Sequence, residues 1–294
     1  MRKSGILLHI SSLPSDYGIG KMGSAAYAFA DFLVDAGVQV WQILPLSPTS
    51  YGDSPYQSFS VYAGNPYFID YEQLEQEGLL TRVDYAGLIW DEDPRRVDYA
   101  HIYQYCYDVL HKAYTRFDQS DADYQSFCRQ QEAWLPEDAL FMALKNANGG
   151  KPWYLWEKSL AMHEPDAIAT AKKLYQDDIA FYCVMQYWFH KQWYKLKHYC
   201  NKRGITIVGD IPIYVAYDSV EVWSQPELFQ LDDDHVPTAV AGCPPDVFSP
   251  SGQLWGNPLY NWNYHKETNY AWWVQRLARA ATLYDTVRID HFRG

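Results

Sequence analysis

The sequence predicts an α/β fold in which about four parallel strands form part of a (β/α)₈ TIM barrel. Short apolar runs typical of buried strands recur along the chain, at residues 5–10, 38–46, 205–215 and 286–290, with helical stretches between them. The rival fold is a doubly wound sheet, which usually has a Gly-rich phosphate loop after its first strand. Here the first run leads into SSLPSDYGIG, whose glycines do not match G-x-G-x-x-G. This mismatch favours the barrel.

The helices are predicted from apolar residues at helical spacing. One helix is expected between the first two runs and should end at Gly37. Its apolar residues at helical spacing are Ala26, Phe29, Ala30, Leu33 and Val34. A second helix is expected near residues 178–202, and a third in TNYAWWVQRLARAATLY (268–284), each before a strand. The Pro- and Gly-rich residues 241–262 are expected to form an irregular loop.

The expected domain organisation follows from this order of elements. Residues 1–64 would hold barrel strands 1 and 2, and residues 178–294 would hold strands 3 and 4 with the loop. Residues 65–177 have mostly helical signals, so we expect a helical subdomain inserted after strand 2.

Composition limits the function classes. With 48% hydrophobic and 20% charged residues the chain is globular, and its net charge of −12 without a Lys/Arg cluster argues against nucleic acid as partner. The 26 Tyr, 12 Trp and 12 Phe indicate either a ring-rich core or a sugar-binding surface. Five scattered cysteines, no run long enough for a bilayer and no signal-peptide core predict a cytoplasmic protein without a membrane partner.

Polar residues at the carboxyl ends of barrel strands are the usual catalytic positions. The predicted strand ends carry His9, Ser11, the segment SPTSYGDSPYQS (47–58), Asp210, Arg288, Asp290 and His291. Arg288 and Asp290 are two residues apart, so their side chains share one face of the strand. Each candidate has a structural alternative: a core histidine, a turn-capping aspartate or an ion pair. Their convergence at one end of the barrel favours an active site.

Other chemistries are disfavoured. LDDDHVP (231–237) offers oxygen ligands in a row, but adjacent residues on a turn seldom converge on one ion, so a solvated loop is preferred over a metal site. The sequence contains no G-x-S-x-G, P-loop or H-E-x-x-H motif, which argues against serine hydrolases, NTPases and zincins.

Four long motifs carry a resemblance: SPTSYGDSPYQSFSVYAGNPYFID, IVGDIPIYVAYDSVEVW, AGCPPDVFSPSGQLWGNPLYNW and VRIDHFRG. In this order they resemble the amylomaltases, the 4-α-glucanotransferases of glycoside hydrolase family 77, over nearly the whole chain. The resemblance implies a barrel of the α-amylase clan type. It also implies cofactor-free transfer of α-1,4-glucan segments between maltooligosaccharides, through a covalent glucosyl-enzyme. An α-glucan hydrolase and a non-catalytic glucan-binding fragment are the alternatives.

The resemblance also implies roles for individual residues. Asp290 of RIDHFRG would be the nucleophile, and Arg288 would keep it ionised and oriented. Sugar contacts are implied for Ser54, Tyr56, Asp210, Asp246 and His291, and Trp255 would stack on a glucose ring. The resemblance also implies that residues 241–262 form the active-site loop.

In the resembled family the acid/base Glu and a stabilising Asp lie downstream of the nucleophile, whereas this sequence ends at Gly294. We therefore expect an N-terminal part of a longer enzyme, nearly inactive alone, with its first and fourth strands at the edges of an open sheet.

Overall fold

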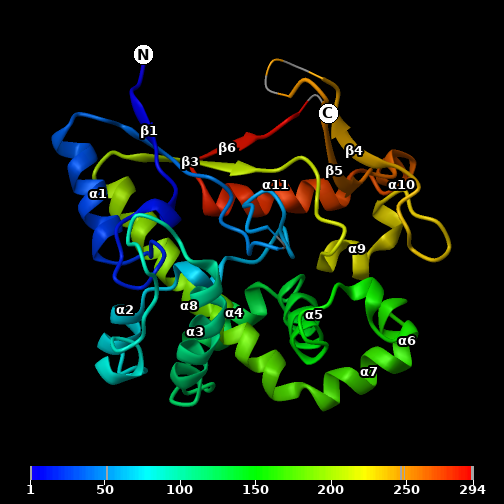
Figure 1. Cartoon of the computed structure of the whole chain (residues 1–294), viewed down its shortest axis with the longest axis horizontal. Coiled ribbons are helices and arrows are strands. Elements are labelled where there is room, and N and C mark those ends of the chain that lie inside the picture. Colours follow the sequence, from blue (N-terminus) through cyan, green and yellow to red (C-terminus); the bar gives the residue numbers. More distant parts are fainter. Residues whose placement is uncertain (1, 51, 246, 248, 293–294) are drawn as a thin grey trace.

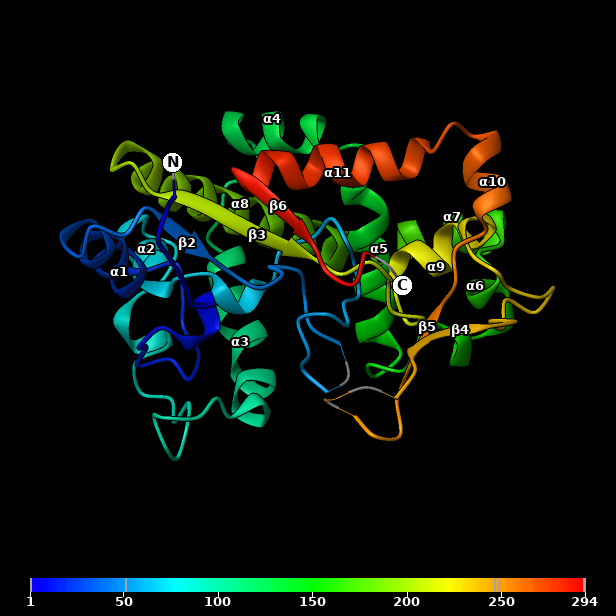
Figure 2. The same ribbon diagram turned by 90° about the horizontal axis from the view of Figure 1, so that it is seen from above.

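A four-stranded parallel sheet forms the centre of the computed structural model, which describes residues 2–50, 52–245, 247 and 249–292. The strand order is β1 (Gly5–Leu7), β2 (Val40–Gln42), β3 (Thr206–Ile211) and β6 (Thr286–Ile289). All three pairings are parallel, and the β3–β6 register places Asp210 opposite Arg288. Figure 2 shows β3 and β6 side by side, with a helix running along them. The predicted α/β class and the four strands are confirmed.

Each connection between neighbouring strands contains a predicted helix. α1 (Ser24–Asp35) buries an apolar stripe and is followed by Gly37 at φ +69°. α8 (Gln176–Lys202) has 27 residues, so it is about 40 Å long and underlies the sheet. α11 (Ala271–Leu283) leads into β6. These three helices are confirmed, because apolar residues spaced three or four apart face the core.

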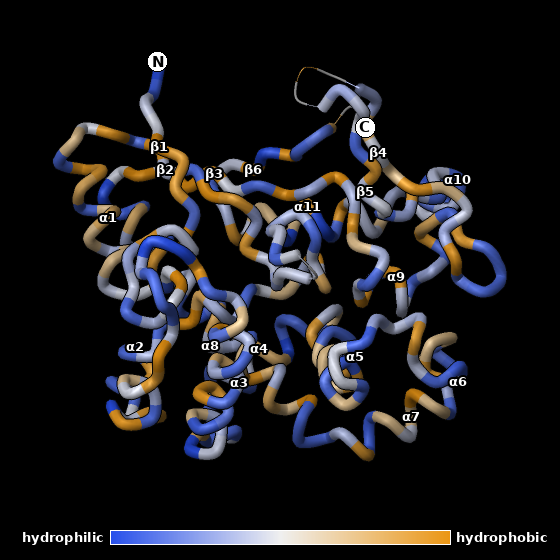
Figure 3. Tube along the Cα trace, in the orientation of Figure 1, coloured by the Kyte–Doolittle hydropathy of each residue, from blue (hydrophilic) through white to orange (hydrophobic). Residues whose placement is uncertain are grey.

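The segment between β2 and α8 is largely helical, as predicted. Its helices are α2 (Tyr71–Gln76), α3 (Tyr99–Tyr114), α4 (Ala122–Gln130), α5 (Leu135–Ala147), α6 (Lys158–Ala161) and α7 (Pro165–Leu174), and they lie below the sheet in Figure 1. Figure 3 shows polar and apolar residues alternating along α7, whose Ile168 and Ala171 are buried. No helix in the described part of the chain is long and apolar enough to cross a bilayer.

Two apolar clusters stabilise this arrangement. One gathers α1, α3, α8 and the strands, and includes Trp41, Trp188 and Trp193. The other joins α5 to α9 (Val220–Ser224) and α11 through Trp153, Trp223 and Trp272. The segment between β2 and α8 contributes to both clusters, so its helices are fixed to the sheet that carries the site. The domain boundaries at 64 and 177 stay a prediction.

The expectation that all four strands are buried is wrong for β1 and β6. Both alternate between exposed and half-buried residues, and Leu7 is 54% exposed. They lie at the two edges of the sheet, as expected for the first and fourth strands, so each has a neighbouring strand on one side only.

The prediction of an irregular loop over residues 241–262 is also wrong in part. An antiparallel hairpin, β4 (Val240–Cys243) and β5 (Gln253–Pro258), rises from this segment, and α10 (Trp262–Glu267) follows it. Glycines read as loop markers serve here as hairpin residues: Gly256 sits inside β5 at φ +77°.

Candidate active site

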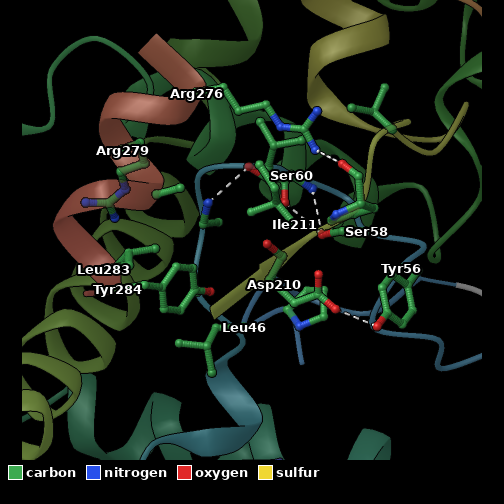
Figure 4. A pocket seen from close by; sticks show the side chains of 18 of the residues that line it. Leu46, Tyr56, Ser58, Ser60, Asp210, Ile211, Arg276, Arg279, Leu283 and Tyr284 are labelled. Atoms are coloured by element: carbon green, nitrogen blue, oxygen red, sulfur yellow. Dashed lines mark hydrogen bonds between the residues drawn. The ribbon is translucent and has the colours of Figure 1, made fainter. Parts of the chain in front are cut away.

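Asp210 is the buried centre of the candidate site. It lies near the carboxyl end of β3, is 0% exposed, and its Oδ2 accepts hydrogen bonds from Tyr56 Oη at 2.7 Å and Arg288 Nη1 at 2.5 Å. Figure 4 shows Tyr56 reaching Asp210 from the neighbouring loop. One carboxylate oxygen thus joins three segments that are far apart in the sequence.

Arg288 connects this buried carboxylate to a more exposed one. Its second terminal nitrogen, Nη2, donates to Oδ1 of Asp290, whose side chain is 36% exposed. Burial lowers the pKa of Arg288, but the charges of Asp210 and Asp290 outweigh this effect and raise it. The guanidinium therefore stays charged between two carboxylates, with the outer one accessible to a ligand.

Burial dominates the protonation equilibria around Asp210. It raises the pKa of Asp210, although the hydrogen bonds from Tyr56 and Arg288 counteract the rise. Burial, together with the hydrogen bond to Asp210, also raises the pKa of Tyr56 to about 12. Tyr56 is therefore a neutral hydrogen-bond donor at physiological pH.

Close packing next to the cluster fixes the position of β3 relative to Tyr284. A Cβ on Gly209 would lie 2.1 Å from Cγ of Tyr284, so only glycine lets this ring pack against the strand next to Asp210. Figure 4 shows Tyr284 beside Asp210 in the same pocket. A cavity of about 30 Å³ lies in that pocket, which Ser58 and Ser60 also line.

The indole ring of Trp255 lies at the edge of the site. Trp255 on β5 is half-buried, and its ring meets His291 edge-on, with centroids 4.8 Å apart and an interplanar angle of 87°. His291 follows Asp290 directly and adopts φ +49°, which turns the chain immediately after the strand. The hairpin therefore brings an indole ring to His291, the residue that follows Asp290 at the end of β6.

Comparison with known proteins places this arrangement in a family. A sequence profile described as 4-alpha-glucanotransferase matches residues 8–294. The chain belongs to the 4-alpha-glucanotransferase family, glycoside hydrolase family 77.

Its similarity to individual family members is extensive. The 4-alpha-glucanotransferases of Clostridium butyricum and Thermus thermophilus are each 47% identical, over 98% and 100% of this chain. The fold is similar to that of the amylomaltase from Streptococcus agalactiae solved with acarbose, with a TM-score of 0.96 at 48% identity over the whole chain. The amylomaltase of Corynebacterium glutamicum has the same fold (TM-score 0.75, 21% identity, 98% of this chain and 40% of that one). The chain spans 59% of both curated relatives and 60% of the Streptococcus structure.

The structure brings most of the predicted site residues of this family member together. Tyr56, Asp210, Arg288 and Asp290 form one hydrogen-bonded cluster, and Trp255 contacts His291 beside it. Ser54 supports the loop, because its Oγ accepts the backbone N–H of Tyr56 at 3.3 Å. Asp246 lies outside the described residues.

Two other sequence candidates, His9 and the acidic run, have contacts that indicate structural roles. His9 is buried edge-on against Phe68, and burial lowers its pKa to about 4, which is typical of a neutral core histidine. The residues of the acidic run, Asp232 to Asp234, are exposed, and Oδ1 of Asp232 accepts the N–H groups of Asp234 and Val236. This carboxylate closes a turn.

Sequence reasoning missed Gln57 and Asn257, whose side-chain amides bond to each other between the loop and the hairpin. Both belong to quoted motifs, DSPYQS and LWGNP, but 200 positions separate them. No local pattern signals such a pair.

Proposed function

We propose that the chain carries the nucleophile side of a retaining 4-α-glucanotransferase site, and that its sheet is part of a (β/α)₈ barrel. The observation that carries the proposal is the bridging guanidinium of Arg288. It holds one carboxylate in the floor of the site and a second, exposed carboxylate at its surface. The named activity of relatives that are 47% identical supports it.

In the proposed reaction, Asp290 attacks the anomeric carbon of the donor glucan. Nη2 of Arg288 holds Oδ1, and in the proposed step the other carboxylate oxygen, Oδ2, attacks. The new C1–Oδ2 bond forms as the glycosidic C1–O bond breaks, and the leaving oxygen takes a proton from a carboxylic acid about 5–5.5 Å from the nucleophile.

The second step returns the enzyme to its starting state. An acceptor sugar hydroxyl attacks C1 and loses its proton to the same acid/base group, while the C1–Oδ2 bond breaks. Asp210 does not fit the acid/base role, because it is fully buried and its Oδ2 is held by Tyr56 and Arg288. It fits a role in fixing Arg288 and Tyr56 toward the donor sugar.

The indole ring of Trp255 and the polar cluster fit a neutral, ring-shaped ligand. Maltooligosaccharides are the proposed substrates, and the acarbose complex of the Streptococcus agalactiae amylomaltase supports a ligand of this kind. We place Trp255 under a glucose ring on the acceptor side, and we place His291, Tyr56 and Ser54 at hydroxyls of the donor sugar. All five cysteines are free, which supports the proposed cytoplasmic location.

The test traps the covalent intermediate in the protein expressed from the complete gene. A 5-fluoroglucosyl fluoride donor needs little acid assistance, so it should label the peptide that contains Asp290, as detected by mass spectrometry. Asp290→Asn should abolish the label. A label on another residue would show that the nucleophile is misassigned.

Maltotriose distinguishes the alternative functions. Products longer than maltotriose indicate transfer, whereas glucose and maltose without longer products indicate hydrolysis. Binding of maltotriose by calorimetry without any turnover would indicate a non-catalytic glucan-binding protein.

A further inference from the structure

The hairpin that carries Trp255 is a separate two-stranded ribbon. β4 and β5 pair only with each other in the described sheets, and Leu254 near the tip is 80% exposed. Isolated two-stranded ribbons are marginally stable in water. The position of Trp255 against His291 therefore depends on contacts between the hairpin and the rest of the molecule.

The most specific of these contacts is an amide pair. Gln57 Nε2 donates to Asn257 Oδ1 at 3.0 Å, and Asn257 Nδ2 donates to Gln57 Oε1 at 3.2 Å. Asn257 Nδ2 also donates to the carbonyl of Val215 at 2.7 Å. Asn257 is 4% exposed, so both donors and the acceptor of its amide are satisfied within the protein.

The pair ties three segments of the site together. Gln57 follows Tyr56, which bonds Asp210, and Val215 lies just beyond β3. Gln57 Nε2 also approaches the carbonyl of Trp255 at 3.5 Å. Between Trp255 and Asn257 stands Gly256 at φ +77°, where the strand kinks. A fixed point beside the kink therefore sets the direction of the indole ring.

We propose that the Gln57–Asn257 amide pair is a positioning device that holds Trp255 against His291, next to Asp290, and so favours a sugar acceptor over water. This inference rests on the proposed function. The covalent intermediate reacts with whichever hydroxyl is correctly placed, and a sugar must be held in position whereas water need not be. Loosening the hairpin therefore slows transfer more than hydrolysis. The hydrogen bonds of Asp290 and Arg288 do not involve the pair, so the first chemical step should change little.

The test replaces Asn257 by Leu, which has a similar size and no hydrogen-bonding group. Gln192→Leu is the matched control, because Gln192 is also a buried amide that bonds across segments: it makes two bonds, to the N–H and carbonyl of Asp70, away from the hairpin. Gln57→Leu is a second variant at a less buried position, in case Asn257→Leu folds poorly.

Two readouts separate positioning from general stability. Hydrogen exchange of the 240–258 peptides should become about tenfold faster in Asn257→Leu and Gln57→Leu and stay unchanged in Gln192→Leu. With maltotriose, the ratio of hydrolysis to transfer should rise about tenfold in the two hairpin variants, while labelling of Asp290 by the fluoride donor stays within about twofold of wild type. The double variant should add little to either single variant, because both remove one interaction.

Each outcome decides a separate claim. Unchanged hydrogen exchange in the hairpin would show that the amide pair does not hold it, whatever the measured activity. Faster exchange with an unchanged hydrolysis-to-transfer ratio would overturn the role in acceptor choice, as would an equal rise in Gln192→Leu. A wild-type protein without transfer activity would refute the proposed function and, with it, the role of the amide pair in acceptor choice. The exchange measurement would still decide whether the pair holds the hairpin.

Discussion

Asp210 on β3 lies directly opposite Arg288 on β6, and Nη1 of Arg288 donates to its Oδ2 at 2.5 Å. An ion pair and a catalytic pair were alternatives from sequence, and here one guanidinium forms ion pairs with two carboxylates. It neutralises a fully buried carboxylate and, through Nη2, holds Asp290 at the surface. Removing one partner of such a buried pair leaves a charge uncompensated, which is the costly outcome.

Arg288→Lys should therefore reduce activity far more than a charge-conserving change usually does. Lysine has a single ammonium on a flexible stem, so it cannot bond Asp210 and Asp290 through separate nitrogens in a fixed plane. In the complete enzyme we expect kcat/KM on maltotriose to fall about 10²–10³-fold. Arg203→Lys is the control, because Arg203 bonds Asp31 through one nitrogen on the exposed surface. Similar losses in both variants would contradict the bridging role.

Trp255→Ala should weaken maltooligosaccharide binding by about tenfold, equivalent to about 1.4 kcal/mol. The half-buried ring contacts His291 and Tyr214 and is not part of either apolar cluster, so the fold should persist. Calorimetric titration with maltotetraose measures the affinity. Trp262→Ala, at an exposed tryptophan outside the cluster of carboxylates, should bind normally. Normal affinity in a folded Trp255→Ala protein would mean that the ring only anchors the hairpin.

Gly209→Ala should destabilise the protein by about 1–3 kcal/mol, the usual cost of overpacking. The added methyl would overlap the ring of Tyr284, which is buried against β3. Urea unfolding gives the free energy. Gly87→Ala is the control, because a Cβ there meets no atom within 4 Å and Gly87 has no positive φ. If Gly209→Ala is as stable as Gly87→Ala, the packing explanation is wrong.

Glu221→Gln should raise stability at high pH relative to wild type. Burial raises the pKa of Glu221 from 4.5 to about 7, only partly offset by the N–H of Val61 and by Arg276, and the nearby Asp138 also has its pKa raised to about 7 by burial. The folded state thus keeps a proton that the unfolded chain releases above pH 4.5. The contribution of Glu221 to unfolding free energy falls by up to about 3 kcal/mol as the pH rises from about 4.5 to about 7.

Thermal unfolding at pH 5 and pH 8 checks this sign. Because glutamine stays neutral, the gain of Glu221→Gln over wild type should be larger at pH 8. The exposed Glu132→Gln variant should show no such pH dependence. A gain that is equal at both pH values would show that Glu221 does not retain its proton in the folded state.

The isolated 294-residue chain should self-associate. β1 and β6 are the edges of its sheet, and apolar surface is exposed by Leu7 on β1 and by Phe292, three residues after β6 (54% and 77% exposed). Light scattering across micromolar concentrations measures the mass, and Leu7→Lys should reduce association by placing a charge on the edge. A monomer at every concentration would contradict the open-edge prediction.

The sequence by itself determined the local structure. Spacings of three and four placed α1, α8 and α11, and the two-residue period of a strand put Arg288 and Asp290 on one face, where they are bonded. These patterns are local, because they depend on the geometry of a single helix or strand. The motifs also predicted which residues form the candidate site, but they did not indicate how those residues contact one another.

Only the tertiary structure decided how the segments meet. Asp210 and Arg288 are 78 residues apart in the sequence, and the β3–β6 register places them opposite each other. Gln57 and Asn257 are 200 residues apart, and they meet because the hairpin packs against the loop that carries Gln57. The same holds for the exposure of β1 and β6 and for the hairpin hidden in a Gly- and Pro-rich stretch. Pairing and burial depend on what approaches a segment from elsewhere in the chain. A local pattern contains no information about that partner.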